Sequence, residues 1–245
     1  MNSGDQSLSP AERQKALVQH LARYRISIRE VLLRRIYHGA EVQLANALQA
    51  LRRKNLVSFR TRGLAGGHTF YQLTEAAYLE LGVGEHAAKE RAKPPSAQPL
   101  HKALATLWFC TMYQPRRRLL DEKKAFDLIP LLPPGNDPHV LEELLDGTPR
   151  LYRLYIPGSR AGHAYTLKNL KSDTLALART PAGEALLRSG TVAFAILVHS
   201  DARRDLFEHE LERIRPLLPL GMLIPIALAP SPDTLPHFLA DRPEI

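Results

Sequence analysis

The chain is organised around the stretch Ile26-Ser27-Ile28-Arg29-Glu30-Val31-Leu32-Leu33-Arg34-Arg35-Ile36-Tyr37-His38-Gly39, which continues to Thr74. Its β-branched start predicts a small strand, and the spacing of its apolar residues then predicts a helix that ends at Gly39. A second helix is expected over Ala40–Lys54, followed by two antiparallel strands over Leu56–Arg60 and His68–Leu73. The predicted order is therefore strand, helix, turn, helix and hairpin.

The predicted second helix has one apolar and one polar face. The core-facing positions have the spacing i, i+3, i+4, i+7 and are Leu44, Ala47, Leu48 and Leu51. The opposite side carries Val42, Asn46, Gln49 and Arg53, with Gln43 and Arg52 on its flanks. Asn and Gln can pair with adenine, Arg with guanine, and Val can contact a thymine methyl. A merely solvated face would more often carry Glu and Lys pairs, so the pattern favours a DNA groove.

The hairpin after this helix offers two further basic residues. Asn55 is expected to close the helix in a left-handed conformation, where Gly or Asn is favoured. Arg60 and Arg62 lie at the end of the first strand and in the glycine-rich connection, where a hairpin can reach DNA phosphate or the minor groove. Plain solubility explains these two arginines equally well.

A family resemblance follows from these residues. The run Val42-Gln43-Leu44-Ala45-Asn46-Ala47-Leu48-Gln49-Ala50-Leu51-Arg52-Arg53-Lys54-Asn55-Leu56-Val57 resembles the recognition helix and first wing strand of winged helix-turn-helix transcription regulators. The run Leu73-Thr74-Glu75-Ala76-Ala77-Tyr78-Leu79-Glu80-Leu81-Gly82 is similar to the helix start that follows the wing in many members. The resemblance covers residues 26–82 and implies a winged helix that binds double-stranded DNA. Asn55 stands where the class usually has Gly.

Composition sets the broad class of the protein. With 245 residues, 44% of them hydrophobic, the chain can build one large or two ordinary cores. It has no apolar run long enough to span a membrane, and its first ten residues lack the apolar segment of a signal peptide. We therefore expect a cytoplasmic protein without membrane contact. Its single cysteine, Cys110, excludes an internal disulfide and a cysteine-based metal site.

The positive charge is concentrated in the N-terminal part. Residues 1–99 contain 15 Lys and Arg against 8 Asp and Glu, a net charge of +7, out of +8 for the whole chain. Cationic side chains displace counterions from DNA phosphates, so this concentration supports DNA binding. A basic but functionally neutral surface is the alternative.

Helix-start residues, prolines and composition predict three segments: a DNA-binding domain over residues 1–90, a linker over 91–99 and an α/β domain over 100–245. Ser9-Pro10 predicts the start of a helix to about Tyr24, and Pro94-Pro95 and Pro99 mark the boundary. In the second half, strands are expected over Leu151–Ile156, Val192–His199 and Met222–Ala229, the last two buried on both faces. The expected helices cover Leu100–Tyr113, Asp137–Gly147, Thr180–Gly190 and Asp201–Arg215, the last with Leu206, Phe207, Leu211 and Ile214 inward. This alternation predicts a mixed α/β fold with some parallel strand pairing.

The second half yields no convincing catalytic motif. Asp121-Glu122-Lys123-Lys124 has the acidic-x-Lys pattern of metal-dependent nucleases, but this pattern is common by chance. The neighbouring Arg116-Arg117-Arg118 is a candidate second phosphate contact. Asp201 is interpreted as a helix cap, and the ten histidines show no metal-ligand spacing. We therefore expect no enzymatic activity, no cofactor and no metal.

The whole chain also resembles, more faintly, the replication-relaxation proteins of plasmids and integrating elements. That resemblance implies a second domain related to restriction endonucleases, with a degenerate core used for association. The leading hypothesis is a sequence-specific transcriptional regulator, a repressor that binds double-stranded DNA as a homodimer, with the second domain in dimerisation or sensing. The alternative is a DNA-processing nuclease or an accessory factor of a mobile element.

Overall fold

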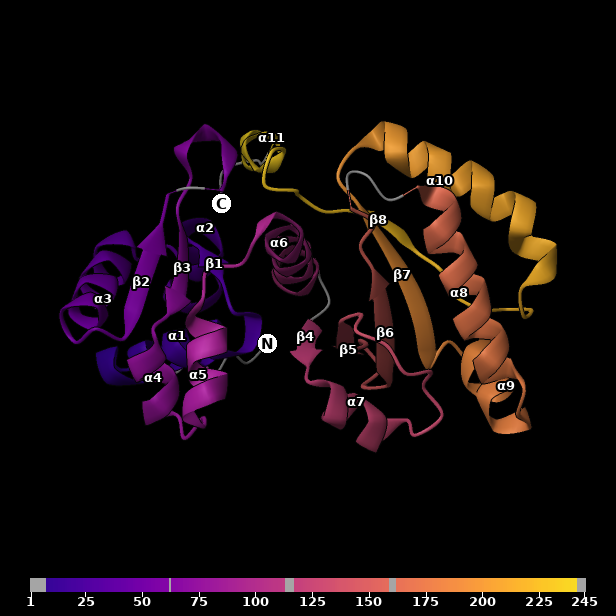
Figure 1. The fold of residues 1–245 in the computed structure, drawn as a ribbon, viewed down its shortest axis with the longest axis horizontal. Helices are drawn as coiled ribbons and strands as arrows, with labels where there is room; N and C mark the ends of the chain where they lie inside the picture. Colours follow the sequence, from indigo (N-terminus) through magenta and orange to yellow (C-terminus); the bar gives the residue numbers. More distant parts are fainter. Residues whose placement is uncertain (1–7, 62, 113–116, 159–161, 242–245) are drawn as a thin grey trace. The chain divides into compact units, whose positions relative to one another are not determined.

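A computed structural model describes residues 8–61, 63–112, 117–158 and 162–241. The chain divides into two compact units, Met1–Ala97 and Gln98–Ile245. The first contains a three-stranded sheet and the second a five-stranded sheet, so the predicted mixed α/β class is confirmed (Figure 1). Each unit is described separately below.

The first unit consists of a small three-stranded sheet with helices before, between and after its strands. Its elements are α1 (Pro10–Tyr24), β1 (Ser27–Ile28), α2 (Arg29–Leu32), the π-helical turn η1 (Leu33–Tyr37), α3 (Glu41–Arg53), β2 (Val57–Arg60), the short turn η2 (Ala65–Gly67), β3 (Phe70–Leu73), α4 (Glu75–Glu80) and α5 (Glu85–Ala92). The sheet has the order β1-β3-β2 and is antiparallel throughout. The predicted small first strand is present, and it pairs with β3 of the hairpin.

Local chemistry explains where these helices begin and end. Ser9 and Glu12 form a reciprocal capping box at the start of α1, in which each side chain accepts from the other residue's backbone N–H. Thr74 caps α4 in a similar way, because its hydroxyl accepts from the N–H of Ala77 at 3.3 Å. Asn55 has φ 56° and takes the predicted left-handed conformation after α3. The backbone therefore reverses from α3 directly into β2.

The core of the first unit holds α3 by its apolar face. Leu44 is fully buried, and the other three apolar positions of this helix are at most 6% exposed. They belong to one cluster with Leu17 and Leu21 of α1 and with Val57 and Leu73 of the hairpin. Burial of apolar surface contributes about 25 cal/mol per Å². This packing therefore fixes which side of α3 faces away from the core.

The segment after α4 also folds onto the first unit. In α5, Ala88 is fully buried in the same core, and the amide of Gln72 donates to the carbonyl oxygen of Ala92 at 2.8 Å. Pro94 and Pro95 follow this helix outside any helix or strand.

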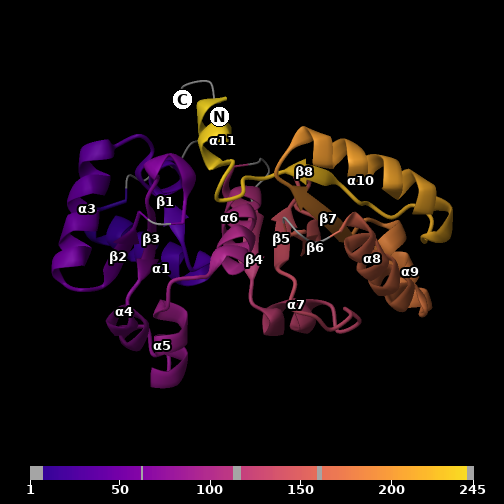
Figure 2. The ribbon, with the colours of Figure 1, turned by 45° about the horizontal axis from the view of Figure 1, so that its top comes forward.

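The second unit is a sheet with helices on both faces. Its elements are α6 (Ala97–Thr111), β4 (Arg117–Leu120), α7 (Glu122–Leu128), β5 (His139–Glu143), β6 (Pro149–Tyr155), α8 (His163–Ala178), α9 (Pro181–Arg188), β7 (Val192–Val198), α10 (Asp201–Ile214), the 3-10 turn η3 (Arg215–Leu217), β8 (Ile226–Leu228) and α11 (Leu235–Ala240). Strands β4, β5 and β6 are antiparallel, whereas β6, β7 and β8 are parallel. Figures 1 and 2 show α6 on one side of this sheet and α8, α9 and α10 on the other. The predicted parallel pairing is thereby confirmed.

One predicted helix of this unit is wrong. Residues 137–147 do not form a helix from Asp137-Pro138; they form β5 and the turn into β6. The turn contains Asp146-Gly147, and the N–H of Gly147 donates to the carbonyl oxygen of Leu144 at 2.9 Å. Pairing with β4 and β6 on both sides outweighs the local helix-start pattern, which depended on two residues only.

Smaller details also differ from the sequence predictions. Strand β7 is buried throughout as expected, but β8 has only three residues, lies at the sheet edge and is half-buried. In α10, Phe207 and Leu211 are buried and Ile214 packs against the core, whereas Leu206 is 40% exposed. Ser200, not Asp201, caps this helix, because the Ser200 hydroxyl accepts from the N–H of Arg203 at 3.4 Å. Along the described ranges, no helix has the length and apolarity to cross a membrane.

Candidate nucleic-acid interface

The side of α3 opposite the core is a continuous exposed surface. We call this surface the polar face of α3. At its centre lie Val42, Asn46, Gln49 and Arg53, all of them exposed. Val42 is 73% exposed, a large value for an apolar side chain. The flanking Gln43 and Arg52 are exposed too. The structure therefore brings these six predicted site residues together on one helix, in the arrangement that the helical period predicts.

Both flanks of this face are held by neighbouring elements. Arg13 of α1 donates a hydrogen bond from its Nη1 to the Oε1 of Gln43. The guanidinium of Arg52 lies over the ring of Phe59 in β2, 4.1 Å from the ring centroid. Phe59 is 40% exposed, so this cation–π contact stands at the edge of the core and in reach of solvent. The flanking side chains are thus oriented before any partner binds.

The centre of the face is unengaged within the described chain. Asn46, Gln49 and Arg53 make no hydrogen bond or ion pair with any described residue. Glu41, the one acidic residue of α3, is paired with Arg29 of α2 at 3.2 Å. Its negative charge is therefore compensated, and the amides and guanidinium of the polar face remain available to an external partner.

The hairpin brings one more predicted basic residue onto the same unit. Arg60 ends β2, pairs in register with Phe70 of β3 and is exposed. Strand β2 is the edge strand of its sheet, so one side of its backbone has no neighbouring strand among the described residues. Arg62 lies outside the described residues. Arg60 is accordingly placed where a hairpin can approach a phosphate backbone.

The segment from residue 26 to residue 74 is strongly basic. It carries eight Arg and Lys residues against two Glu, a net charge of +6. This excess is not balanced by internal pairing, because Arg35, Arg53 and Arg60 are exposed and form no ion pair with described residues. Such a surface raises the local concentration of a polyanion and attracts it from a distance.

A π-helical turn sets the start of α3, and the sequence did not predict it. Over Leu33–Tyr37 the helix widens, His38 then has φ 47° and Gly39 has φ 86°. The N–H of Gly39 donates to the carbonyl oxygen of Leu33 at 3.2 Å, and that of Ala40 to Tyr37 at 2.9 Å. Two consecutive left-handed residues turn the chain sharply, so α3 leaves the preceding helix in a new direction.

The candidate residues of the second unit have structural partners. Asp121 caps α7, where its carboxylate accepts from the N–H of Lys124 at 2.8 Å, and Lys123 lies exposed on that helix. Arg117 donates from its Nε to Glu142 at 2.7 Å, so this arginine is engaged within the second unit. Arg118 is exposed, whereas Arg116 lies outside the described residues.

Two buried polar clusters were missed by sequence reasoning. In the first, Glu142 is 1% exposed and accepts from the hydroxyl of Tyr152 at 2.8 Å as well as from Arg117. In the second, Arg153 is 3% exposed and lies 3.3 Å from a carboxylate oxygen of Asp173 and 3.7 Å from one of Asp137. Their members come from separate strands and helices, so no spacing along the chain indicates them.

Comparison with known proteins adds no further assignment. The sequence matches no protein-family model, no curated protein and no solved structure. Functional inference therefore depends on the residues and their geometry. In these terms the surface around the polar face of α3 is the strongest candidate site, because exposure, charge and hydrogen-bonding capacity coincide there.

Proposed function

We propose that the first unit is a winged helix that binds double-stranded DNA in a sequence-specific manner, as part of a transcriptional regulator that acts as a repressor. The observation that carries the proposal is the centre of the polar face of α3, which is exposed, is not engaged by any described residue and lies opposite a buried apolar face. The order of helix, strand, helix, helix and hairpin is the order that winged helix-turn-helix regulators have. In this proposal α3 is the recognition helix and the β2–β3 hairpin is the wing.

The chemistry of the face suits a major groove. Asn46 and Gln49 each offer an amide that pairs with the N6 and N7 edge of adenine, and Arg53 offers a fork for the O6 and N7 of guanine. Val42 can contact a thymine methyl. Arg13 and Arg52 lie at the flanks of this face and Arg60 ends β2 of the same unit; all three would neutralise phosphates, which fixes orientation without reading sequence.

The first experiment selects bound duplexes from a random pool and then measures affinity by fluorescence anisotropy at several salt concentrations. We expect an enriched motif and a steep fall of affinity with salt, because each neutralised phosphate releases counterions. On the enriched duplex, Asn46→Ala and Arg53→Ala should each weaken binding about 5- to 150-fold, since a bidentate base contact contributes about 1–3 kcal/mol.

The matched control is Lys89→Ala, which removes one positive charge from the exposed surface of α5 in the same unit. It should leave the enriched motif unchanged and weaken binding far less than Arg53→Ala. The proposal fails if selection returns no enriched sequence, or if the Asn46→Ala and Arg53→Ala protein binds the motif as the unaltered protein does. Weak binding without salt dependence would instead favour a protein partner for this surface.

The proposal includes a homodimer. A single recognition helix covers one half-site, and two-fold related copies would bind an inverted repeat with half-sites about one helical turn, 10 to 10.5 base pairs, apart or a multiple of it. Sedimentation of the protein with the selected duplex tests this directly. A complex of one chain per duplex would refute the dimer while leaving DNA binding intact.

The alternative, a DNA-processing role in a mobile element, predicts a different observation. Supercoiled plasmid incubated with the protein and Mg²⁺ or Mn²⁺ would be nicked or linearised. Loss of that cleavage in Asp121→Ala or Lys123→Ala would identify the acidic-x-Lys segment as its source. Asp121 already has a structural role as the cap of α7, so Asp121→Asn, which preserves capping, is the control for stability.

A further inference from the structure

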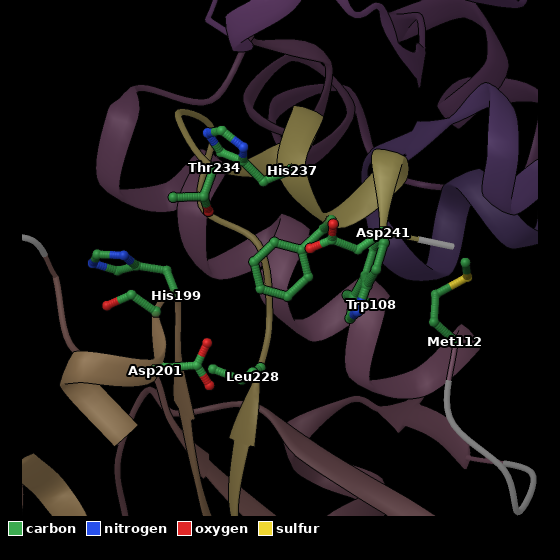
Figure 3. A pocket seen from close by; sticks show the side chains of 10 residues that line it. Trp108, Met112, His199, Asp201, Leu228, Thr234, His237 and Asp241 are labelled. Carbon is green, nitrogen blue, oxygen red and sulfur yellow. The ribbon is translucent and has the colours of Figure 1, made fainter. Parts of the chain in front are cut away.

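The second unit contains a cavity of about 510 Å³ that the proposed function does not use. It lies at the carboxyl ends of the parallel strands β7 and β8, next to the first turn of α10 and beside α11. Figure 3 shows His199 and Asp201 on one side of it and Trp108 and Met112 on the other. Ligand pockets in proteins have volumes of about 300–1,000 Å³ and favour the carboxyl ends of parallel strands.

One wall of the cavity is apolar and aromatic. Trp108 of α6 and Phe238 of α11 meet edge to face, with ring centroids 5.5 Å apart and an interplanar angle of 88°. Met112 lies on this side of the cavity, whereas Leu228 lies beside Asp201 (Figure 3). Such a corner offers two perpendicular ring surfaces, which can pack against a flat or aliphatic body and attract a cation to a ring face.

The other wall provides hydrogen-bonding groups. The Nδ1 of His199 is buried and has no hydrogen-bond partner among the described residues. Burial, together with the positive charge of Arg203, lowers the pKa of His199, so this imidazole is neutral at pH 7. The Nη1 of Arg203 lies 3.4 Å from the Nε2 of His199 and can only donate, so the Nδ1 of the neutral ring carries the hydrogen and can donate to an acceptor. Thr234 and His237 lie on the same wall (Figure 3).

The charges around the cavity favour a cationic ligand over an anionic one. Asp201 and Asp241 line it, and none of its described lining residues is Lys or Arg. Asp201 is already paired with Arg204 at 2.8 Å, and with Ser200 it satisfies the positive N-terminal end of α10. Asp241 forms no ion pair with any residue that the structure describes, so its carboxylate is open to a ligand. The lining acids and histidines do not form a metal-ion cluster in the described part of the chain.

We propose that this cavity binds a small organic cation, a protonated amine carried by an aromatic or aliphatic body. The body packs in the corner of Trp108 and Phe238, and the ammonium group pairs with the carboxylate of Asp241. The site is independent of the proposed DNA binding, because every residue that lines it belongs to the second unit. It gives this unit a sensing role of defined ligand chemistry.

The test uses the full chain and its own fluorophore. Trp108 is the only tryptophan of the protein, so its emission on excitation near the red edge of the indole band reports the cavity directly. Three probes share a phenyl body and differ in charge: 2-phenylethylamine, 3-phenyl-1-propanol and 3-phenylpropionate. We expect a saturable change with the amine, a weaker one with the alcohol and none with the carboxylate at equal concentration.

Two variants locate the effect. Asp241→Asn should weaken binding of the amine at least about tenfold, the loss expected for a charge-assisted hydrogen bond, with an unchanged emission maximum of the free protein. Asp205→Asn removes the same charge from the exposed surface of α10 outside the cavity and should leave the affinity unchanged. Tighter binding of the carboxylate, no saturable change with any probe, or equal losses in both variants would each overturn the proposal. Failure here leaves the DNA-binding proposal untouched, since neither DNA nor α3 enters the measurement.

Discussion

The buried cluster around Arg153 makes the sharpest prediction about stability. Arg153→Met keeps the aliphatic stem and removes the guanidinium, which lies 3.3 Å from Asp173 and 3.7 Å from Asp137 and donates to the carbonyl oxygen of Pro133 at 2.6 Å. Removing one partner of a buried ion pair costs about 3–5 kcal/mol, because the remaining charge stays buried without compensation. The loss is a large part of the 5–15 kcal/mol that stabilises a typical domain.

The remaining partners of the two carboxylates place the expected loss at the lower end of that range. Asp173 still accepts from the hydroxyl of Tyr155, and Asp137 still has Lys102 at 3.4 Å. We therefore expect the second unit of Arg153→Met to lose about 3 kcal/mol. Urea titration followed by the fluorescence of the single tryptophan measures it, because that residue, Trp108, is buried in the same unit.

Two further variants make the reasoning refutable. Arg118→Met removes an exposed arginine from β4 and should change the stability by no more than about 0.5 kcal/mol. The double variant Arg153→Met and Asp173→Asn should have a free energy of unfolding about 1 kcal/mol or more above that of Arg153→Met, because it lacks one of the carboxylates left without the arginine. A loss in Arg153→Met equal to that in Arg118→Met, or no recovery in the double variant, would refute the assignment of Arg153 as the counter-charge.

Two other substitutions test packing and pH dependence in the same titration. Gly183→Ala should destabilise the second unit by about 2–3 kcal/mol, because its Cβ would lie 1.9 Å from the backbone oxygen of Leu177; the exposed neighbour Ala182→Ser should be nearly neutral. Burial and the nearby Arg153 lower the pKa of His139 from 6.5 to about 4, so its neutral form is favoured in the folded state. That contribution is full above pH 6.5 and is lost as the pH falls toward about 4, by about 2 kcal/mol between pH 6.5 and pH 5. His139→Leu should flatten the pH profile by this amount, and an unchanged slope would contradict the prediction.

The first unit was predicted well because its determinants are local. The apolar period of Leu44, Ala47, Leu48 and Leu51 identifies both the buried and the exposed side of α3, since a helix of known pitch has no freedom to place them otherwise. Asn55 and the caps act within a few residues. What the sequence could not provide is the support from distant residues: Arg13 against Gln43 joins α1 to α3, and no spacing rule links positions so far apart.

The second unit was predicted less well because long-range pairing decides it. Asp137-Pro138 has the local pattern of a helix start, yet Glu142 lies in a strand and is satisfied by Arg117 on β4 and Tyr152 on β6. A buried carboxylate costs several kcal/mol without such partners. The strand is therefore stabilised by contacts that a local pattern does not contain. The cavity was missed for the same reason, because Trp108, His199 and Phe238 come from separate parts of the chain.

Some side chains on α3 contact neighbouring elements and others do not, and this difference would affect how the proposed DNA contact forms. Arg52 over Phe59 and Gln43 bonded to Arg13 have already lost rotamer freedom, so contacts to phosphate at these flanks require little further ordering. Asn46 and Arg53 at the centre are unrestrained in the described chain and must be ordered when they bind. The loss of side-chain entropy is offset only where the base edge accepts and donates all the hydrogen bonds that these side chains can make. A mismatched base does not offset it. In the proposed complex, the ordered flanks would favour binding to any DNA, whereas the unrestrained centre would make the affinity depend on sequence.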